Sequence, residues 1–462
     1  MDDQSGLPLG RQVLPSGRQV QLPSLTRREA LKRAGVLAGV VVAGGGLSAC
    51  GIGLEDEASA GSGGSKKKAP VLLGIVDPYS GAYAASGASQ TQGAELAVAE
   101  LNEAGGILGG RRIEIRKRDD ATKPDVGARG ARELIGQENV DVIVGVVSSG
   151  VGLAVSEACS QLGCPLVLSG THDDTITGTS AHRTTFRVTT ESIMIARVVV
   201  GPLMKATGKR WFFITADYAY GLGAEKAMIA ELTKAGGSVV AAEHTPLGTT
   251  DFSAQLTKAR GSGATTVVLV LYGADLIAAS KQFNEFGLNG KLGLGGHLNG
   301  LEMAVGIGPD RVHGIFGTPW NADIATPASK KFVGDIKRRT GQTANFRHYL
   351  GYLAAREALE GFDRAKTTDA TKWVAAMEGH RFDTLKEHDG YWRDWDHQAV
   401  HDPLAIEAIP KAEWKFENQY FKTIATGDGE KIAPTKEENA AGLQRIKEEK
   451  IVARADYTSK EA

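Results

Sequence analysis

The sequence carries no surplus of positive charge. Its 53 Lys and Arg residues stand against 54 Asp and Glu residues, which gives a formal net charge of -1. Proteins that bind nucleic acid use Lys and Arg to neutralise phosphates, and no DNA- or RNA-binding module is visible here. The charge balance therefore argues against a nucleic-acid partner.

The sequence also has no long hydrophobic run. The longest, residues 34–49, is too short and too rich in glycine for a membrane-spanning helix, which needs about 20 apolar residues. It is typical of the apolar part of an export signal. Arg27 and Arg28 precede it and resemble a twin-arginine signal, although Ala30 stands where a bulky residue is usual. The general secretory route therefore stays open.

Cysteine is scarce, with three residues in the whole chain. Cys50 ends the apolar run in the order Leu47-Ser48-Ala49-Cys50, which resembles a bacterial lipobox whose cysteine is diacylated. The alternative is a free cysteine among small residues. Two acyl chains suffice for stable attachment, so we expect an exported lipoprotein, either anchored at the outer face of the cytoplasmic membrane or periplasmic.

Cys159 and Cys164 are the other two cysteines. In an oxidising compartment they could form a disulfide, and they could equally be two buried thiols that act as small apolar side chains. The sequence leaves both possibilities open.

Glycine is abundant, at 59 residues spread along the chain, and it suits the many tight turns of an α/β fold. From residue 71, short apolar runs alternate with stretches of helical periodicity, as in successive βαβ units. Ten strands are predicted to begin near residues 71, 111, 141, 164, 184, 210, 238, 265, 291 and 312. The series runs twice, so we predict two doubly wound α/β lobes with parallel sheets.

These patterns divide the chain into five parts. We expect an export signal with lipobox at 1–50, a flexible tether at 51–69, a first lobe at 70–190, a second lobe at 191–320 and a charged, frayed or loosely helical tail at 426–462. Residues from about 321 to 390 are expected to return to the first lobe, and those from about 391 to 425 to the second.

Motifs of common α/β enzymes are missing from the sequence. Gly221-Leu222-Gly223 lacks the third glycine of a dinucleotide-binding loop, no phosphate-binding loop with its lysine occurs, and no G-x-S-x-G elbow is present. His397 and His401 are four residues apart, but the glutamate of the H-E-x-x-H zinc motif is absent. We therefore expect no enzyme, no cofactor and no metal site.

Several stretches, in order from residue 71 to 409, resemble the type I periplasmic binding proteins that serve ABC importers of branched-chain amino acids, amides and urea. They include PYSGAYAASGASQTQGAELAVAELNEAGG, DVIVGVVSSGVGLAVSEACSQLGCPLVLSGT, ADYAYGLG and RDWDHQAVHDPLAIE. The resemblance implies two lobes joined by crossover strands, which close like a flytrap on a small polar ligand. It places His397 and His401 near the crossings.

In this family the ligand lies between the lobes, beyond the carboxyl ends of the strands, where loop N–H groups and helix N-termini meet it. The resemblance implies ligand contacts from these residues: Ser149, Gly150, Ser169, Gly170, Thr171, Tyr218, Tyr220, Tyr272 and His297. Ser148 is as well suited to capping a helix as to binding. One of Tyr218 and Tyr220 is expected to pack inward, and Tyr218 is favoured for the site.

His297 is where the sequence departs most from the branched-chain amino acid receptors. They tend to carry an acid near this loop to pair the ligand ammonium, whereas this chain has His297, Leu298 and Asn299. Glu302 is a possible but poorly placed substitute, and His297 itself is either a ligand contact or an exposed loop residue. The missing acid favours an amide, urea-like or small carboxylic ligand over a simple amino acid.

The resulting hypothesis is a receptor that captures a small polar solute, an amino acid, an amide or urea-like compound or a small carboxylic acid, and delivers it to the permease subunits of an ABC transporter. Ligand binding would stabilise the closed form of a hinged protein. A ligand-sensing regulator of the same fold is the alternative, and an α/β enzyme ranks below both.

Overall fold

A five-stranded parallel sheet forms the centre of lobe 1. Its order is β2-β1-β3-β4-β5, from β1 (Val71–Asp77), β2 (Ile113–Asp119), β3 (Val142–Gly145), β4 (Leu166–Leu168) and β5 (Thr185–Arg187). Helices α1 (Ala84–Glu103), α2 (Pro124–Gly136) and α3 (Ser149–Gln161) connect these strands, and the short 3-10 turn η2 (Asp174–Thr177) precedes β5. This computed structural model describes residues 68–454. The predicted export signal, Cys50 and most of the tether lie outside the described residues.

Lobe 2 contains a seven-stranded sheet of order β15-β14-β10-β9-β8-β6-β7. Its strands are β6 (Arg210–Ala216), β7 (Ser238–Thr245), β8 (Thr266–Val270), β9 (Gly293–Leu298), β10 (Ile315–Thr318), β14 (Leu404–Ala408) and β15 (Phe421–Thr426). The first five are parallel, and β14 and β15 add antiparallel strands at the edge. Every residue of β8, with sequence TVVLV, is buried, as expected for a strand covered on both faces.

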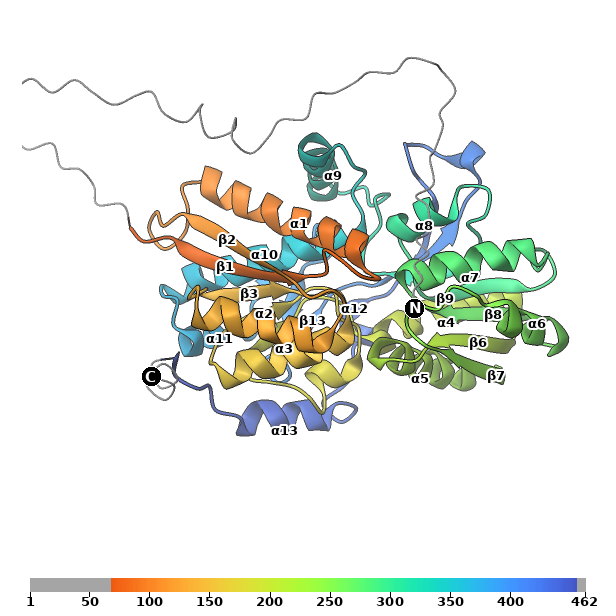
Figure 1. Ribbon diagram of the computed structural model, residues 1–462, viewed down its shortest axis with the longest axis horizontal. Helices are drawn as coiled ribbons and strands as arrows, with labels where there is room; N and C mark the ends of the chain where they lie inside the picture. The colour runs from red at the N-terminus through yellow and green to blue at the C-terminus, as the bar shows by residue number, and fades with distance from the viewer. Residues whose placement is uncertain (1–67, 455–462) are drawn as a thin grey trace, which may run out of the picture. The chain divides into compact units, whose positions relative to one another are not determined.

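Helices cover the sheet of lobe 2, and Figure 1 shows those drawn in green around it. They are α4 (Ser192–Thr207), α5 (Ala219–Lys234), α6 (Ser253–Gly261), α7 (Gly273–Glu285) and α8 (Leu301–Ile307). Among the described residues, no helix is both long and apolar enough to cross a membrane.

The chain then returns to lobe 1 through three helices, α9 (Pro327–Thr340), α10 (Phe346–Ala365) and α11 (Ala370–Met377). Helix α10 packs along α1. A small sheet of β11 (Arg381–Phe382), β12 (Gly390–Trp392) and β13 (Ala399–Val400) follows, before the chain crosses to β14 and β15 in lobe 2. The lobes are therefore joined after β5, after β10 and after β13.

The prediction of a two-lobed α/β fold with parallel sheets is confirmed. Each of the ten predicted strand segments contains one strand, and the helices predicted between residues 326 and 379 are present. Strands β11 to β15 were not among the ten. Of these, β11, β12 and β13 are only two or three residues long, and β15 alternates in burial.

The tail was expected to be frayed or loosely helical, and its described part is helical and docked on lobe 1. Residues 428–454 include α12 (Gly429–Ile432) and α13 (Ala440–Glu448), and the side chain of Ile446 is buried. The charged composition of this segment suggested a solvated chain, but its few apolar residues are spaced so that one face of α13 meets lobe 1.

Candidate functional site

The loops that follow the strands of both sheets meet at one small cavity between the lobes. Its volume is about 10 Å³, room for roughly one water molecule, so the lobes stand in a closed arrangement. The cavity is lined by Tyr83, Val147, Ser149, Gly170, His172 and Arg347 from lobe 1, and by Tyr218, Tyr220, Tyr272 and Leu298 from lobe 2.

Four tyrosines form the apolar part of this cavity. The hydroxyls of Tyr83 and Tyr218 lie 2.6 Å apart, across the boundary between the lobes. The ring of Tyr83 meets that of Tyr272 edge-on, with centroids 5.3 Å apart, and Tyr220 packs against both Tyr218 and Tyr272. Burial raises the pKa of all four phenols, so each stays neutral and can donate a hydrogen bond.

Arg347 brings a positive charge to the cavity from the first turn of α10. Asn345 caps this helix, because its side-chain oxygen accepts hydrogen bonds from the backbone N–H groups of Arg347 and His348 at 2.9 and 3.0 Å. The guanidinium donates to the Tyr272 hydroxyl at 2.8 Å and to the Gly170 carbonyl at 3.0 Å. Only 2% of the side chain is exposed, so this cation is almost fully desolvated.

Glu302 faces Arg347 from α8 of lobe 2. Its Oε1 accepts a hydrogen bond from the Tyr272 hydroxyl at 2.5 Å and lies 3.9 Å from Arg347 Nε. Its Oε2 is buried and has no hydrogen-bond partner among the described residues. Burial raises the pKa of the Glu302 carboxyl, and the charge of Arg347 opposes this rise. Glu302, expected to be a possible but poorly placed substitute for the missing acid, therefore lies beside Tyr272 and Arg347, although it is not among the residues that line the cavity.

The predicted loop residues of lobe 1 follow strands β3 and β4. Ser149 begins α3, and its hydroxyl accepts hydrogen bonds from the backbone N–H groups of His172 and Asp173 at 3.2 and 3.3 Å. The hydroxyls of Ser169 and Thr171 are buried and have no hydrogen-bond partner within residues 68–454. Since an unpaired buried hydroxyl costs free energy, both groups are suited to meet a polar ligand.

Not every predicted residue reaches the cavity wall. Ser149, Gly170, Tyr218, Tyr220 and Tyr272 line it, whereas Gly150, Ser169, Thr171 and His297 are not among its lining residues. His297 is fully buried behind Tyr220, so it is not an exposed loop residue. Its Nε2 lies 3.1 Å from the Ser192 carbonyl and its Nδ1 lies 3.3 Å from the Tyr220 hydroxyl. Burial lowers the pKa of His297 to about 4.

The sequence analysis did not assign four residues of this site. Tyr83, His172, Leu298 and Arg347 line the cavity. A signal existed for Tyr83, which lies in the quoted stretch PYSGAYAASG directly after the first strand. None marked Arg347, because an arginine in the first turn of a helix is ordinary until the fold buries it.

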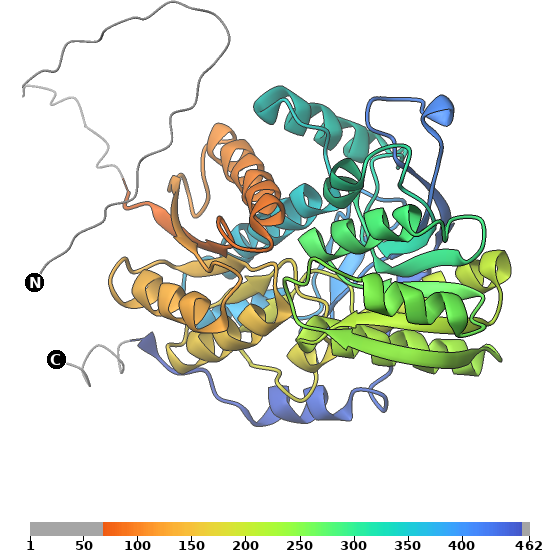
Figure 2. The ribbon, with the colours of Figure 1, turned by 45° about the vertical axis from the view of Figure 1, so that its right-hand side comes forward.

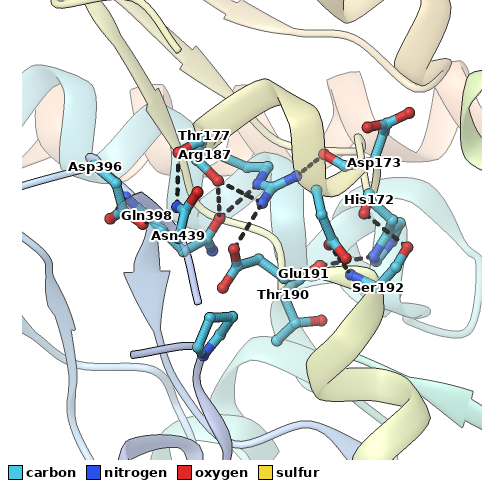
Figure 3. Close-up of polar contacts among 12 residues, drawn as sticks. His172, Asp173, Thr177, Arg187, Thr190, Glu191, Ser192, Asp396, Gln398 and Asn439 are labelled. Carbon is cyan, nitrogen blue, oxygen red and sulfur yellow. Dashed lines mark hydrogen bonds and ion pairs between the residues drawn. The ribbon is translucent and has the colours of Figure 1, made fainter. Parts of the chain in front are cut away.

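A network of buried charges surrounds the crossing between the lobes, as Figure 3 shows. Arg187, fully buried at the end of β5, donates to Gln398 Oε1 at 2.5 Å and to the Thr177 hydroxyl at 2.7 Å. Glu191 lies 3.5 Å from Arg187 and 3.1 Å from Arg393, and so neutralises charge on both sides of the crossing. These hydrogen bonds and ion pairs fix the crossing segments relative to one another.

The two spaced histidines belong to this crossing region. His397 stacks on Phe186, with ring centroids 4.0 Å apart, and His401 Nε2 lies 2.8 Å from the Val188 carbonyl. Across the described residues, no three His, Cys, Asp or Glu side chains are grouped to hold a metal ion. Cys159 and Cys164 are both buried free thiols.

Comparison with known proteins gives the family of this chain. Residues 70–411 match the periplasmic binding protein family. The Leu/Ile/Val-binding protein homolog 3 of Brucella melitensis is 30% identical over 311 residues, which cover 66% of this chain and 82% of that protein.

Two solved structures show the same architecture. A periplasmic binding protein from Burkholderia mallei is 26% identical and has a TM-score of 0.76, over 81% of this chain and 99% of the other. An ABC-transporter solute-binding protein from Rhodopseudomonas palustris, solved with 3,4-dihydroxybenzoic acid, is 20% identical and has a TM-score of 0.71, over 78% and 98%. This last likeness is one of fold. The chain belongs to the periplasmic binding protein family, the solute-binding components of ABC transporters.

Proposed function

We propose that this protein captures a small carboxylic acid between its lobes and that Arg347 binds the ligand carboxylate. The observation that carries the proposal is the buried guanidinium itself. Its nearest carboxylate, that of Glu302, lies 3.9 Å from Nε, beyond hydrogen-bond distance. A buried cation without a close anion is costly, and a planar guanidinium matches a carboxylate with two parallel hydrogen bonds.

The surroundings of Arg347 support an aromatic or otherwise flat acid. Tyrosine rings that line the cavity can pack against the faces and edges of an aromatic ligand, and the hydroxyls of Tyr83 and Tyr218 can donate to its polar groups. The R. palustris protein was solved with an acid of this kind, 3,4-dihydroxybenzoic acid, which supports the same ligand class here.

An amino acid is the second candidate, and Glu302 favours it. The unpaired Glu302 Oε2 could accept a hydrogen bond from a ligand ammonium while Arg347 or the N-terminus of α3 holds the carboxylate. The B. melitensis relative bears the name of a Leu/Ile/Val-binding protein homolog. Amide and urea-like ligands rank below both, because they leave Arg347 without an anion.

The protein would act at the outer face of the cytoplasmic membrane. The signal with Arg27 and Arg28, the lipobox ending at Cys50 and the polar tether support export and lipid anchoring. Closure on the ligand would present both lobes to the permease subunits of the transporter, which would take up the solute.

A thermal-shift screen tests the ligand class, because a ligand that binds only the folded protein raises its melting temperature by mass action. Benzoate, 3,4-dihydroxybenzoate, leucine and benzamide form an informative set. We expect the acids to stabilise the protein more than benzamide does. Equal stabilisation by benzamide and benzoate would refute a site built around a carboxylate.

A further inference from the structure

The segment after β15 leaves lobe 2 and docks on lobe 1. It lies beyond residue 411, where the match to the family ends. Figure 2 shows α13, in dark blue, along the gold elements of lobe 1. Glu449 accepts hydrogen bonds from Ser160 at 2.6 Å and from the ring of His182 at 2.7 Å, and the side chain of Ile446 is 2% exposed. The docking is therefore specific, and it adds a fourth crossing between the lobes.

Two consecutive residues of this segment are tied to different lobes. Glu438 forms an ion pair of 2.6 Å with Arg197, which lies on α4 of lobe 2 and is also paired with Glu231 of α5. The Asn439 side chain donates to the Thr177 carbonyl of lobe 1 at 2.9 Å and to Asp396, beside the crossing, at 2.8 Å. Figure 3 shows Asn439 reaching toward Asp396 and Thr177.

Neighbouring Cα atoms are about 3.8 Å apart, so the chain between Glu438 and Asn439 cannot stretch. Arg197 and Thr177 can therefore move apart only as far as the rotation of these side chains allows before one of the contacts breaks. The three connections between the lobes after β5, β10 and β13 do not impose this restraint. Each runs from one lobe to the other as a strand or loop that can bend.

The segment runs along a hollow between the lobes, beside the place where Ser192 of α4 bonds to Asp174 of lobe 1. A cavity of about 740 Å³ lies between η2 of lobe 1 and α5 of lobe 2, and Pro434, Glu438 and Asn439 form part of its wall. Across this cavity the segment supplies direct contacts to both lobes. Opening of the lobes would widen it and pull on the segment.

We propose that residues 428–449 form a latch that holds the lobes closed and shifts the equilibrium between open and closed forms toward the closed one. The latch lowers the population of the open protein without touching the ligand cavity. Loss of the latch would raise the open population, and a ligand would leave faster.

Hydrogen–deuterium exchange of the full chain, without any ligand, tests the latch. A Glu438→Gln/Asn439→Ala variant should exchange faster at residues 147–153 and 218–221, which include the cavity-lining Val147, Ser149, Tyr218 and Tyr220. The expected increase is about two- to tenfold, the factor that one hydrogen bond of ordinary net strength contributes to an equilibrium. Glu437→Gln, which removes a neighbouring surface charge, should exchange like the wild type.

A second variant distinguishes a segment that restrains the lobes from a tail that only packs on lobe 1. Inserting Gly-Ser-Gly between Glu438 and Asn439 lengthens the connection but leaves both side-chain contacts possible. We expect faster exchange at the cleft and unchanged exchange at 440–449. Cleft exchange at the wild-type rate in both variants would overturn the proposal, and, since no ligand is present, that result would leave the proposed ligand class untouched.

Discussion

The guanidinium Nε of Arg347 and the carboxylate of Glu302 lie 3.9 Å apart across the closed cleft, and the Tyr272 hydroxyl bridges them. The two charges cancel, but neither has the close, fully hydrogen-bonded partner that makes a buried ion pair favourable. A carboxylic ligand would accept hydrogen bonds from Arg347. Glu302 would then be free to bind a proton or to accept a hydrogen bond from a donor group of the ligand. Because Arg347 belongs to lobe 1 and Glu302 to lobe 2, a ligand whose charges interact with both side chains would favour the closed form.

Replacing Arg347 by glutamine should abolish most of the affinity for carboxylic ligands. Hydrogen bonds to charged groups contribute about 1.5–3 kcal/mol each, so the loss should exceed tenfold in Kd. Isothermal titration with the best acid from the screen measures it. Arg356→Gln on the same helix is the matched control, since Arg356 is 43% exposed and pairs with Glu360. An affinity for acids that survives in Arg347→Gln would refute the role of this arginine.

Alanine substitution of Ser149, Thr171 or Tyr218 should weaken binding while the protein stays folded. Each change removes a polar partner at or behind the cavity wall, at a cost of about 1–3 kcal/mol. Titration of each variant, with circular dichroism to check folding, measures the effect. The candidate cleft would be rejected if all three variants bound the ligand as tightly as the wild type.

The fold could be predicted from the sequence much more fully than the site. Buried parallel strands such as TVVLV, and their alternation with helices, are patterns among neighbouring residues. Such patterns can be recognised in the sequence without knowledge of distant contacts. Arg347 and Glu302 show why the site is harder to predict than the fold. They lie 45 residues apart, each in a helix, and their side chains meet only when the two lobes come together. The docking of the tail could not be predicted for a related reason, since the donors that bind Glu449 come from distant residues of lobe 1.

Replacing Cys50 by alanine should release the protein from the membrane. The lipobox cysteine is the only predicted attachment point, and without its acyl chains the apolar area that holds the protein to lipid is lost. Fractionation of cells into membrane and soluble exported material measures the change. Membrane association as firm as that of the wild type would contradict the lipoprotein hypothesis.

Acid should destabilise the folded protein partly through His297. Burial lowers the pKa of His297 from its ordinary 6.5 to about 4, so between these values the unfolded chain binds a proton that the folded protein does not. The stabilising contribution is complete above pH 6.5 and is lost as the pH falls toward 4. Urea unfolding at several pH values should therefore show a shallower pH dependence for His297→Gln than for the wild type. Equal slopes in the wild type and in His297→Gln would refute the assignment.

Replacing Gly273 by alanine should block closure of the lobes without removing any polar group. Gly273 begins α7 in lobe 2, and an added Cβ would lie 2.8 Å from a ring carbon of Tyr83 and 3.1 Å from the Ala82 carbonyl in lobe 1. These are closer than van der Waals contact, so only a more open arrangement accommodates the methyl group. We expect weaker ligand binding and a larger radius of gyration by solution scattering.

Gly287→Ala is the control for this substitution. Both glycines adopt a positive φ, +60° at Gly273 and +61° at Gly287, so both alanines carry the same backbone strain, of about 1 kcal/mol. An added Cβ at Gly287 meets nothing within 4 Å, so this variant should lose stability but bind the ligand normally. If the two variants lose affinity equally, backbone strain explains the effect and the contact between Gly273 and Tyr83 does not control closure.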